Sequence, residues 1–274
     1  MLTFIPTPIG NPQDITIRAL KEFEKASLFL CEDTRETKRL LRILEERFDF
    51  TYPSDEVEFL SFHEHNGAER LAEVASRLAR EEVVYVSDAG MPVISDPGQL
   101  LVAHCQKHQV TYDVLPGGTA VTTAYAASGF EEGEFTFCAF LPQKGSERTT
   151  ALIAMMNART NTVLYEAPHR IEKLLTEIVA IDEERELFLA KELTKKFQNY
   201  YRGLAKEILL QFGENSINSK GEWVVVIKSK EADSKALYVE DVLVLDLQPK
   251  VKAKLLAKLT NKSVKAWYAE LINQ

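Results

Sequence analysis

Three short apolar segments in the first 120 residues each run directly into a loop rich in glycine and proline. The segments cover residues 2–5, 83–86 and 110–115, and the loops follow them at 6–12, 87–98 and 116–120. β-Branched and aromatic residues recur in the segments, which predicts buried strands. Because ligands bind at the carboxyl ends of strands in an open α/β sheet, these loops are expected to share one ligand site.

Helical patterns fill the intervals between these strands. A first helix is expected to begin with Asp14 as its cap, a second at Thr34 and a third after Asn66. Further strands over residues 27–31 and 59–62 complete the alternation. Regular alternation of strands and helices predicts a mainly parallel sheet with right-handed crossovers.

The pattern changes at Pro116, which predicts one α/β domain over residues 1–116 and a second over 117–229. A helix of small residues over 119–128 opens the second domain. Its expected strands cover residues 135–139, 162–165, 187–190 and 222–227. Its other expected helices cover residues 147–157, 170–179 and 204–212.

Residues 230–274 are predicted to form a linker and a basic helical tail. Beyond residue 249 the tail carries a single acid, Glu270, against lysines at positions 250, 252, 254, 258, 262 and 265. Apolar residues interleave with the lysines and predict two short amphipathic helices. A basic tail on an acidic chain suits contact with RNA, and an ordinary packed appendage with solvated lysines remains the alternative.

Composition narrows the class of protein. No apolar run approaches the roughly 20 residues that span a bilayer, and the start carries no secretory signal pattern. The three cysteines, Cys31, Cys105 and Cys138, are far apart and form no CxxC, so a cytoplasmic protein with reduced thiols and no membrane partner is expected. The net charge of −8 disfavours tight binding of naked nucleic acid and still permits a local basic face.

Nine short runs rich in glycine, proline and charged residues occur at intervals along the chain. They are PTPIGN from residue 6, EDTR from 32, SDAGMP from 87, DPG from 96, LPG from 115, FLP from 140, YEAPHR from 165, KELTK from 191 and GE from 221. Together these runs resemble the tetrapyrrole methylase family of S-adenosylmethionine-dependent methyltransferases. The resemblance is closest to the branch that methylates ribosomal RNA, and the lysine-rich tail resembles that branch's helical extension. Two positions depart from the branch pattern, since Met91 replaces a usual threonine and Gly118 a usual proline or serine.

The resemblance implies a fold of two α/β domains, a parallel-sheet N-terminal one and a mixed-sheet C-terminal one, with the cofactor between them and a small helical tail. It implies a homodimer that methylates a cytidine ribose 2′-hydroxyl in 16S rRNA within the assembled small ribosomal subunit. Two alternatives stay open. One is a methylase of the same fold that acts on a tetrapyrrole or a modified histidine, and the other is a non-catalytic ribosome-associated binding module.

The resemblance also assigns a cofactor site. S-Adenosylmethionine carries a reactive sulfonium cation, which carbonyl dipoles of glycine-rich loops can meet at close range. The residues expected to bind it are Ile9, Gly90, Met91, Ile94, Thr119, Ala120, Leu141 and Tyr165.

Charged residues at the strand ends are the candidates for catalysis. Asp33, Glu32 and Asp88 are candidate acceptors for the 2′-hydroxyl proton, and the substrate is expected to contact Arg35, His65 and Lys195. The alternative for the acids is local structure, with Glu32 and Asp33 at a helix start and Asp88 and Asp96 bonded to loop amides. No metal is expected, because residues 63–65, His-Glu-His, lack a third ligand at suitable spacing.

Overall fold

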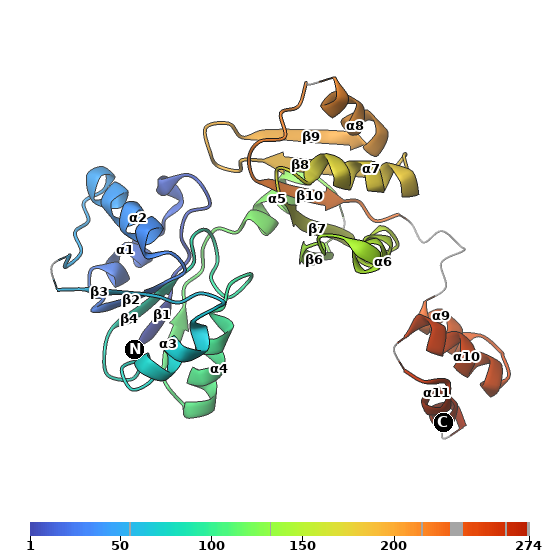
Figure 1. Ribbon diagram of the computed structural model, residues 1–274, viewed down its shortest axis with the longest axis horizontal. Coiled ribbons are helices and arrows are strands. Elements are labelled where there is room, and N and C mark those ends of the chain that lie inside the picture. The colour runs from blue at the N-terminus through green and yellow to red at the C-terminus, as the bar shows by residue number, and fades with distance from the viewer. Residues whose placement is uncertain (55, 132, 215, 231–237, 261, 273–274) are drawn as a thin grey trace.

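The computed structural model describes residues 1–274 except 55, 132, 215, 231–237, 261 and 273–274. Two α/β units and a helical tail follow one another along the chain (Figure 1). The first unit contains a five-stranded sheet in the order β3-β2-β4-β1-β5, and all of its strand pairs are parallel. The strands are β1 (Leu2–Phe4), β2 (Leu28–Cys31), β3 (Glu58–Ser61), β4 (Val83–Val86) and β5 (Tyr112–Val114). The predicted parallel sheet is confirmed.

Helices cover both faces of the first sheet (Figure 1). A 3-10 turn (Pro12–Asp14) precedes the helices α1 (Ile17–Phe23), α2 (Thr34–Arg47), α3 (Gly67–Val74) and α4 (Gln99–His108). Apolar residues of α1 and α2 pack with Phe29 and Val84, and those of α3 and α4 pack with Leu30 and Tyr85. Successive residues of one strand therefore serve opposite cores, as the two-sided burial of a parallel sheet requires.

Two predicted helix caps differ from the structure. Asp14 does not cap α1, because it ends the 3-10 turn, and the Thr16 hydroxyl accepts the Ala19 amide instead. Asn66 does precede α3, but its side chain accepts the amide of His63 at 2.8 Å and leaves the helix amides uncapped. In both places the residue belongs to a turn before the helix and not to its cap.

The second unit contains a mixed five-stranded sheet in the order β6-β7-β10-β8-β9, in which only β6 and β7 are parallel. Its strands are β6 (Phe135–Phe140), β7 (Asn161–Glu166), β8 (Glu186–Lys191), β9 (Asn199–Leu204) and β10 (Trp223–Ile227). The sequence gives no expectation of β9, since its residues NYYRGL are polar and largely exposed at the sheet edge. The mixed sheet is confirmed.

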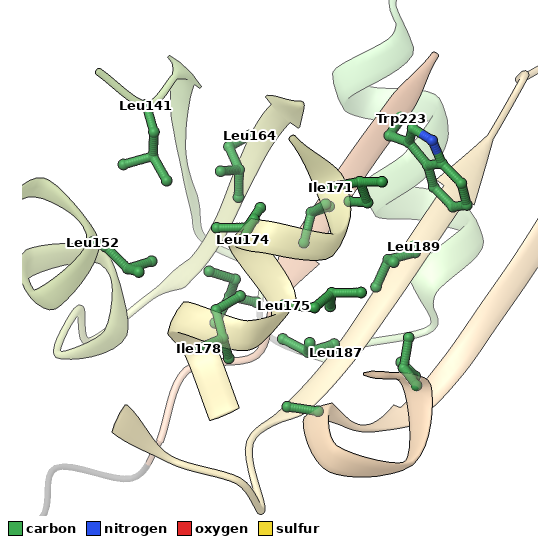
Figure 2. Close-up of a cluster of buried hydrophobic side chains, with 14 of the residues drawn as sticks. Leu141, Leu152, Leu164, Ile171, Leu174, Leu175, Ile178, Leu187, Leu189 and Trp223 are labelled. Carbon is green, nitrogen blue, oxygen red and sulfur yellow. The ribbon is translucent and has the colours of Figure 1, made fainter. Parts of the chain in front are cut away.

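One helix lies on one face of the second sheet and three lie on the other. The single helix is α5 (Ala120–Ser128), and the three are α6 (Gly145–Met156), α7 (Ile171–Ile181) and α8 (Ala205–Gly213). Leucines and isoleucines of α7 pack onto the sheet beside Leu187, Leu189 and Trp223 (Figure 2). This large core fixes the strand ends that face the first unit.

The described part of the tail contains three helices, one more than predicted: α9 (Val239–Val244), α10 (Pro249–Leu259) and α11 (Val264–Ile272). It is joined to the second unit by an ion pair of 2.9 Å between Arg159 and Asp241 and by the Arg159 guanidinium over the Tyr238 ring. Most of the expected linker, residues 231–235, lies outside the described residues. Within the described chain, no helix combines the length and apolarity that a membrane crossing needs.

Candidate functional site

A cavity of about 550 Å³ lies between the two units, at the carboxyl ends of the first sheet's strands. Its volume falls within the range of small-molecule sites. Residues from the first unit, called here the first wall, are Ile9, Glu32 and the lining residues 87–91 and 94–96. Residues from the second unit, the second wall, are Thr119, Ala120, Phe140, Tyr165, Glu166, Ala167, Pro168, Ala190, Leu193, Glu222, Trp223 and Val224.

The loops after β1 and β4 are tied together in the first wall. Thr7 and Gly90 exchange both backbone hydrogen bonds, each at 3.0 Å. Gly90 has a φ of 84°, a conformation that glycine adopts without steric cost. The neighbouring Ile9 packs against an apolar cluster of the second unit, so this loop also bridges the two walls.

Seven of the eight residues predicted to bind the cofactor line this cavity; the exception is Leu141. The Leu141 side chain lies in the core of the second unit (Figure 2). Its carbonyl oxygen accepts a 2.7 Å hydrogen bond from Arg170, so Leu141 shapes the second wall from behind. The cofactor assignment of all eight residues stays a prediction.

Glu32 and Asp88 are linked by hydrogen bonds to backbone amides in the first wall. The Glu32 carboxylate accepts the Asp88 amide at 3.2 Å, and the Asp88 carboxylate accepts the Asp33 amide at 3.0 Å. Burial raises the pKa of the Glu32 carboxyl, and burial likewise raises the pKa of Asp88. Both carboxyl groups line the cavity, where a carboxylate with a raised pKa is suited to accept a proton.

Asp33, the third candidate base, has a different environment. Its carboxylate caps α2 by accepting the Arg35 amide and also binds the Arg35 guanidinium at 3.1 and 2.6 Å. The hydrogen bonds from Arg35 lower the pKa of Asp33 to about 2. A carboxylate stabilised in this way is a weak base, and neither Asp33 nor Arg35 lines the cavity.

The three residues predicted to contact substrate lie outside the cavity lining. Arg35 is 87% exposed at its side chain, and His65 is exposed after β3. Lys195 forms ion pairs with Glu192 at 3.3 Å and with Glu222 at 2.9 Å. The geometry leaves Arg35 and His65 accessible to a large substrate and assigns Lys195 a contact within the second unit.

The second wall is supported by buried ion pairs that the sequence analysis does not predict. Glu166 is fully buried at the end of β7 and pairs with Arg148 at 3.4 Å and with Arg170 at 2.9 Å. Arg148 also donates to the Pro142 carbonyl at 3.1 Å. These contacts fix the loop after β6, which places Phe140 against Tyr165 at the cavity surface. The motifs FLP and YEAPHR contain several of these residues, but their composition does not indicate which side chains face the cavity and which are buried.

The cavity fits a ligand with both apolar and polar parts. Ile9, Met91, Ile94, Phe140 and Tyr165 supply apolar surface, and the loop backbones supply polar groups. The Ser87 hydroxyl is buried at the cavity and has no hydrogen-bond partner among the described residues. Among the residues that the structure describes, no three His, Cys, Asp or Glu side chains are grouped so that they could hold a metal ion.

Comparison with known proteins defines the class. The family model of the tetrapyrrole (corrin/porphyrin) methylases matches residues 1–209, and the chain belongs to this family and is a methyltransferase. The fold is similar to that of a cobalt precorrin-4 methyltransferase, with a TM-score of 0.58, 18% identity and coverage of 82% of this chain and 93% of that one. Uroporphyrin III C-methyl transferase from Thermus thermophilus gives a TM-score of 0.56, 16% identity and coverage of 89% and 99%.

Three curated relatives with high identity share one name. Ribosomal RNA small subunit methyltransferase I from Helicobacter pylori is 43% identical, and the match covers 98% of this chain and 96% of the relative. The protein of that name from Campylobacter fetus is 41% identical over 99% of this chain and 100% of its own length. The one from Thermotoga maritima is 40% identical and covers 84% of this chain and 99% of its own length.

Proposed function

We propose that this protein transfers a methyl group from S-adenosylmethionine to the RNA of the small ribosomal subunit. The acceptor is the ribose 2′-hydroxyl of a cytidine in 16S rRNA within the assembled subunit. The protein acts in the cytoplasm as a homodimer. The observation that carries the proposal is a cavity that joins an apolar, backbone-rich pocket to two carboxyl groups, Glu32 and Asp88, whose pKa values are raised. The relatives with more than 40% identity over nearly the whole chain support RNA as the substrate.

The walls divide the work of binding and alignment. S-Adenosylmethionine, when bound, supplies a methyl group already activated on a sulfonium. Gly90, Met91 and Ile94 in the first wall and Ala120 and Tyr165 in the second are the residues that would hold it. Alignment of two reactants in a closed site can lower the barrier by about 7–11 kcal/mol.

Removal of the ribose hydroxyl proton is assigned to the Glu32 or the Asp88 carboxylate. As the ribose oxygen forms its bond to the methyl carbon and the carbon–sulfur bond breaks, the hydroxyl proton moves to a carboxylate. Glu32 and Asp88 are the candidates, since both line the cavity and burial raises the pKa of each. Asp33 ranks behind them, because its hydrogen bonds with Arg35 hold its pKa near 2.

Recognition of the RNA uses surfaces around the cavity. Arg35 and His65 are exposed close to the first sheet's strand ends, where a phosphate or a base can reach them. The lysine-rich tail presents a basic surface on a chain whose net charge is −8. The family match ends at residue 209, so the tail is additional to the shared methylase fold.

The decisive experiment is transfer of a labelled methyl group to three acceptors: isolated small ribosomal subunits, a short unstructured RNA and uroporphyrinogen III. The expected result is one 2′-O-methylated cytidine in 16S rRNA from intact subunits and little product from the short RNA. Methylation of uroporphyrinogen III in place of the subunits would favour a tetrapyrrole enzyme. Cofactor binding without transfer to any subunit preparation would indicate a non-catalytic module.

A further inference from the structure

The first wall contains a strained turn between Met91 and Gly98. Val93 has a φ of 76°, which is unusual for any residue except glycine and especially costly for a β-branched one. On either side of Val93, Met91 and Ile94 line the cavity. The strained residue therefore lies between two residues that line the cavity.

Asp96 is the residue that holds this turn. One carboxylate oxygen accepts the Val93 amide at 2.7 Å. The other accepts the Gly98 amide at 2.9 Å and the Tyr85 hydroxyl at 2.6 Å. Tyr85 is fully buried on β4, so the carboxylate connects the turn to the core of the first unit.

The turn is also tightly packed at Gly98. A Cβ atom at Gly98 would lie 2.5 Å from the Tyr85 ring and 2.9 Å from the Asp96 carboxylate. Strained backbone persists only where the surroundings determine it more than once, and here a carboxylate and a buried ring do so. Without the Asp96 acceptor, Val93 would relax toward negative φ and move both cavity-lining neighbours.

We propose that Asp96 is a positioning residue that keeps the Met91–Ile94 segment in its cofactor-binding shape by accepting the Val93 amide. The proposal rests on the proposed function for the identity of the cofactor. Asp96 has no part in proton transfer in this scheme, because both of its oxygens are engaged by donors from the protein. Its effect is on affinity for the methyl donor and its product.

A double-mutant cycle separates positioning from general stability. Asp96→Ala removes the acceptor of the Val93 amide and is expected to weaken binding of S-adenosylhomocysteine about tenfold or more, measured by calorimetry. In a Val93→Gly background the same change should cost less than about threefold, because glycine adopts positive φ without the carboxylate. The Michaelis constant for small subunits should change less than about twofold in either background.

Two variants serve as controls. Tyr85→Phe removes one donor to Asp96 and leaves both backbone contacts, so it should lower the melting temperature without a comparable loss of affinity. Gln99→Ala removes only a long 3.5 Å bond to the Val93 carbonyl and should have no effect on affinity. Equal tenfold losses in both Val93 backgrounds, or an equal loss of affinity in Tyr85→Phe, would overturn the proposal.

Amide exchange in the unaltered protein gives a test that does not depend on folding of the variants. The Val93 and Gly98 amides should be protected before any cofactor is added, and rapid exchange of the Val93 amide would contradict the proposal. Failure of the unaltered protein to bind S-adenosylhomocysteine would instead count against the proposed function.

Discussion

The two walls of the cavity are held by opposite chemistry. In the first wall, carboxylates accept hydrogen bonds from backbone amides. The Glu32 carboxylate accepts the Asp88 amide, and the Asp88 carboxylate accepts the Asp33 amide. The Asp96 carboxylate accepts the amides of Val93 and Gly98. In the second wall, guanidinium groups donate to backbone carbonyls, as Arg170 does to Leu141 and Arg148 to Pro142.

The difference explains how each wall meets a ligand. Carboxylates that accept loop amides place negative charge beside the pocket, which suits a cationic methyl donor and a departing hydroxyl proton. The arginines of the second wall both pair with the buried Glu166, Arg148 also pairs with Glu177 at 2.8 Å, and neither arginine lines the cavity. The first wall therefore combines support with chemistry, and the second wall provides a rigid apolar surface. Substitutions in the two walls should fail in different ways.

The largest expected effect is on stability and arises in the second wall. Arg148→Met removes a buried cation, breaks its ion pairs with Glu166 and Glu177 and leaves the Pro142 carbonyl without that donor. Breaking a buried ion pair costs about 3–5 kcal/mol, which chemical denaturation can measure. The matched control, Arg39→Met, removes an exposed 3.5 Å ion pair with Glu36 and should cost less than about 1 kcal/mol. An equal effect of both changes would mean that the second wall does not depend on its ions.

The next effect is on catalysis and arises in the first wall. Glu32→Gln and Asp88→Asn should preserve folding, and the change at the catalytic base should lower the rate of methyl transfer by about 10²–10⁴-fold in single-turnover assays. Asp33→Asn should lower that rate much less, because the Asp33 carboxylate is already bound to Arg35. Near-full turnover by all three variants would eliminate a carboxylate base.

A third change tests the contact between the walls. A Cβ at Gly10 would lie 2.8 Å from the Leu193 carbonyl and 2.7 Å from the Thr194 hydroxyl. Gly10→Ala should therefore separate the walls, cost about 1–3 kcal/mol of stability and weaken binding of S-adenosylhomocysteine several-fold. Gly133→Ala, with nothing within 4 Å of its added methyl group, is the control. Unchanged affinity in Gly10→Ala would show that this contact does not set the width of the cavity.

The smallest effect is a displacement of pH profiles. Burial raises the pKa of Glu32 and Asp88, so methyl transfer should fall as pH drops through values above the ordinary carboxyl range of about 4. Folding responds in the reverse sense, because a raised carboxyl pKa favours the folded state at low pH and loses that contribution as pH rises through it. Asp33, with a pKa lowered to about 2, stabilises above about pH 4 and loses its contribution as pH falls through 2.

The acid limb of the kcat/KM profile measures the first of these shifts. Whichever of Glu32 and Asp88 is the base, its variant (Glu32→Gln or Asp88→Asn) should lose the acid limb. The variant of the other residue should retain the limb. A limb at the ordinary carboxyl pKa in the unaltered enzyme would contradict a base that burial perturbs.

Sequence patterns predicted the strands whose burial follows their composition. β4, with the sequence VVYV, is buried at every position and needs no further information. β9 could not be predicted in this way, because an edge strand with polar exposed residues has neither an apolar run nor strict alternation. The cap of α1 was also missed, since the 3-10 turn that occupies Asp14 depends on Pro12 and on the Asn11 side chain.

The candidate site divides along similar lines. The glycine and proline loops placed Gly90, Met91 and Thr119 at the cavity because strand ends converge in a parallel sheet. The inward position of Leu141 and the role of Glu166 depend on Arg148 and Arg170, which belong to other elements of the fold, and local patterns carry no information about such pairs. The cofactor and substrate assignments remain predictions.

The interior position of β1 has a consequence for the order of synthesis. β1 precedes the other strands of its sheet along the chain, yet it pairs with β4 and β5, the last two strands of that sheet. The cavity itself needs Ile9 from one end and Val224 from the other. A growing chain thus cannot assemble the site until nearly the whole of both units has been made, and a chain truncated within β10 should be unable to take up the methyl donor.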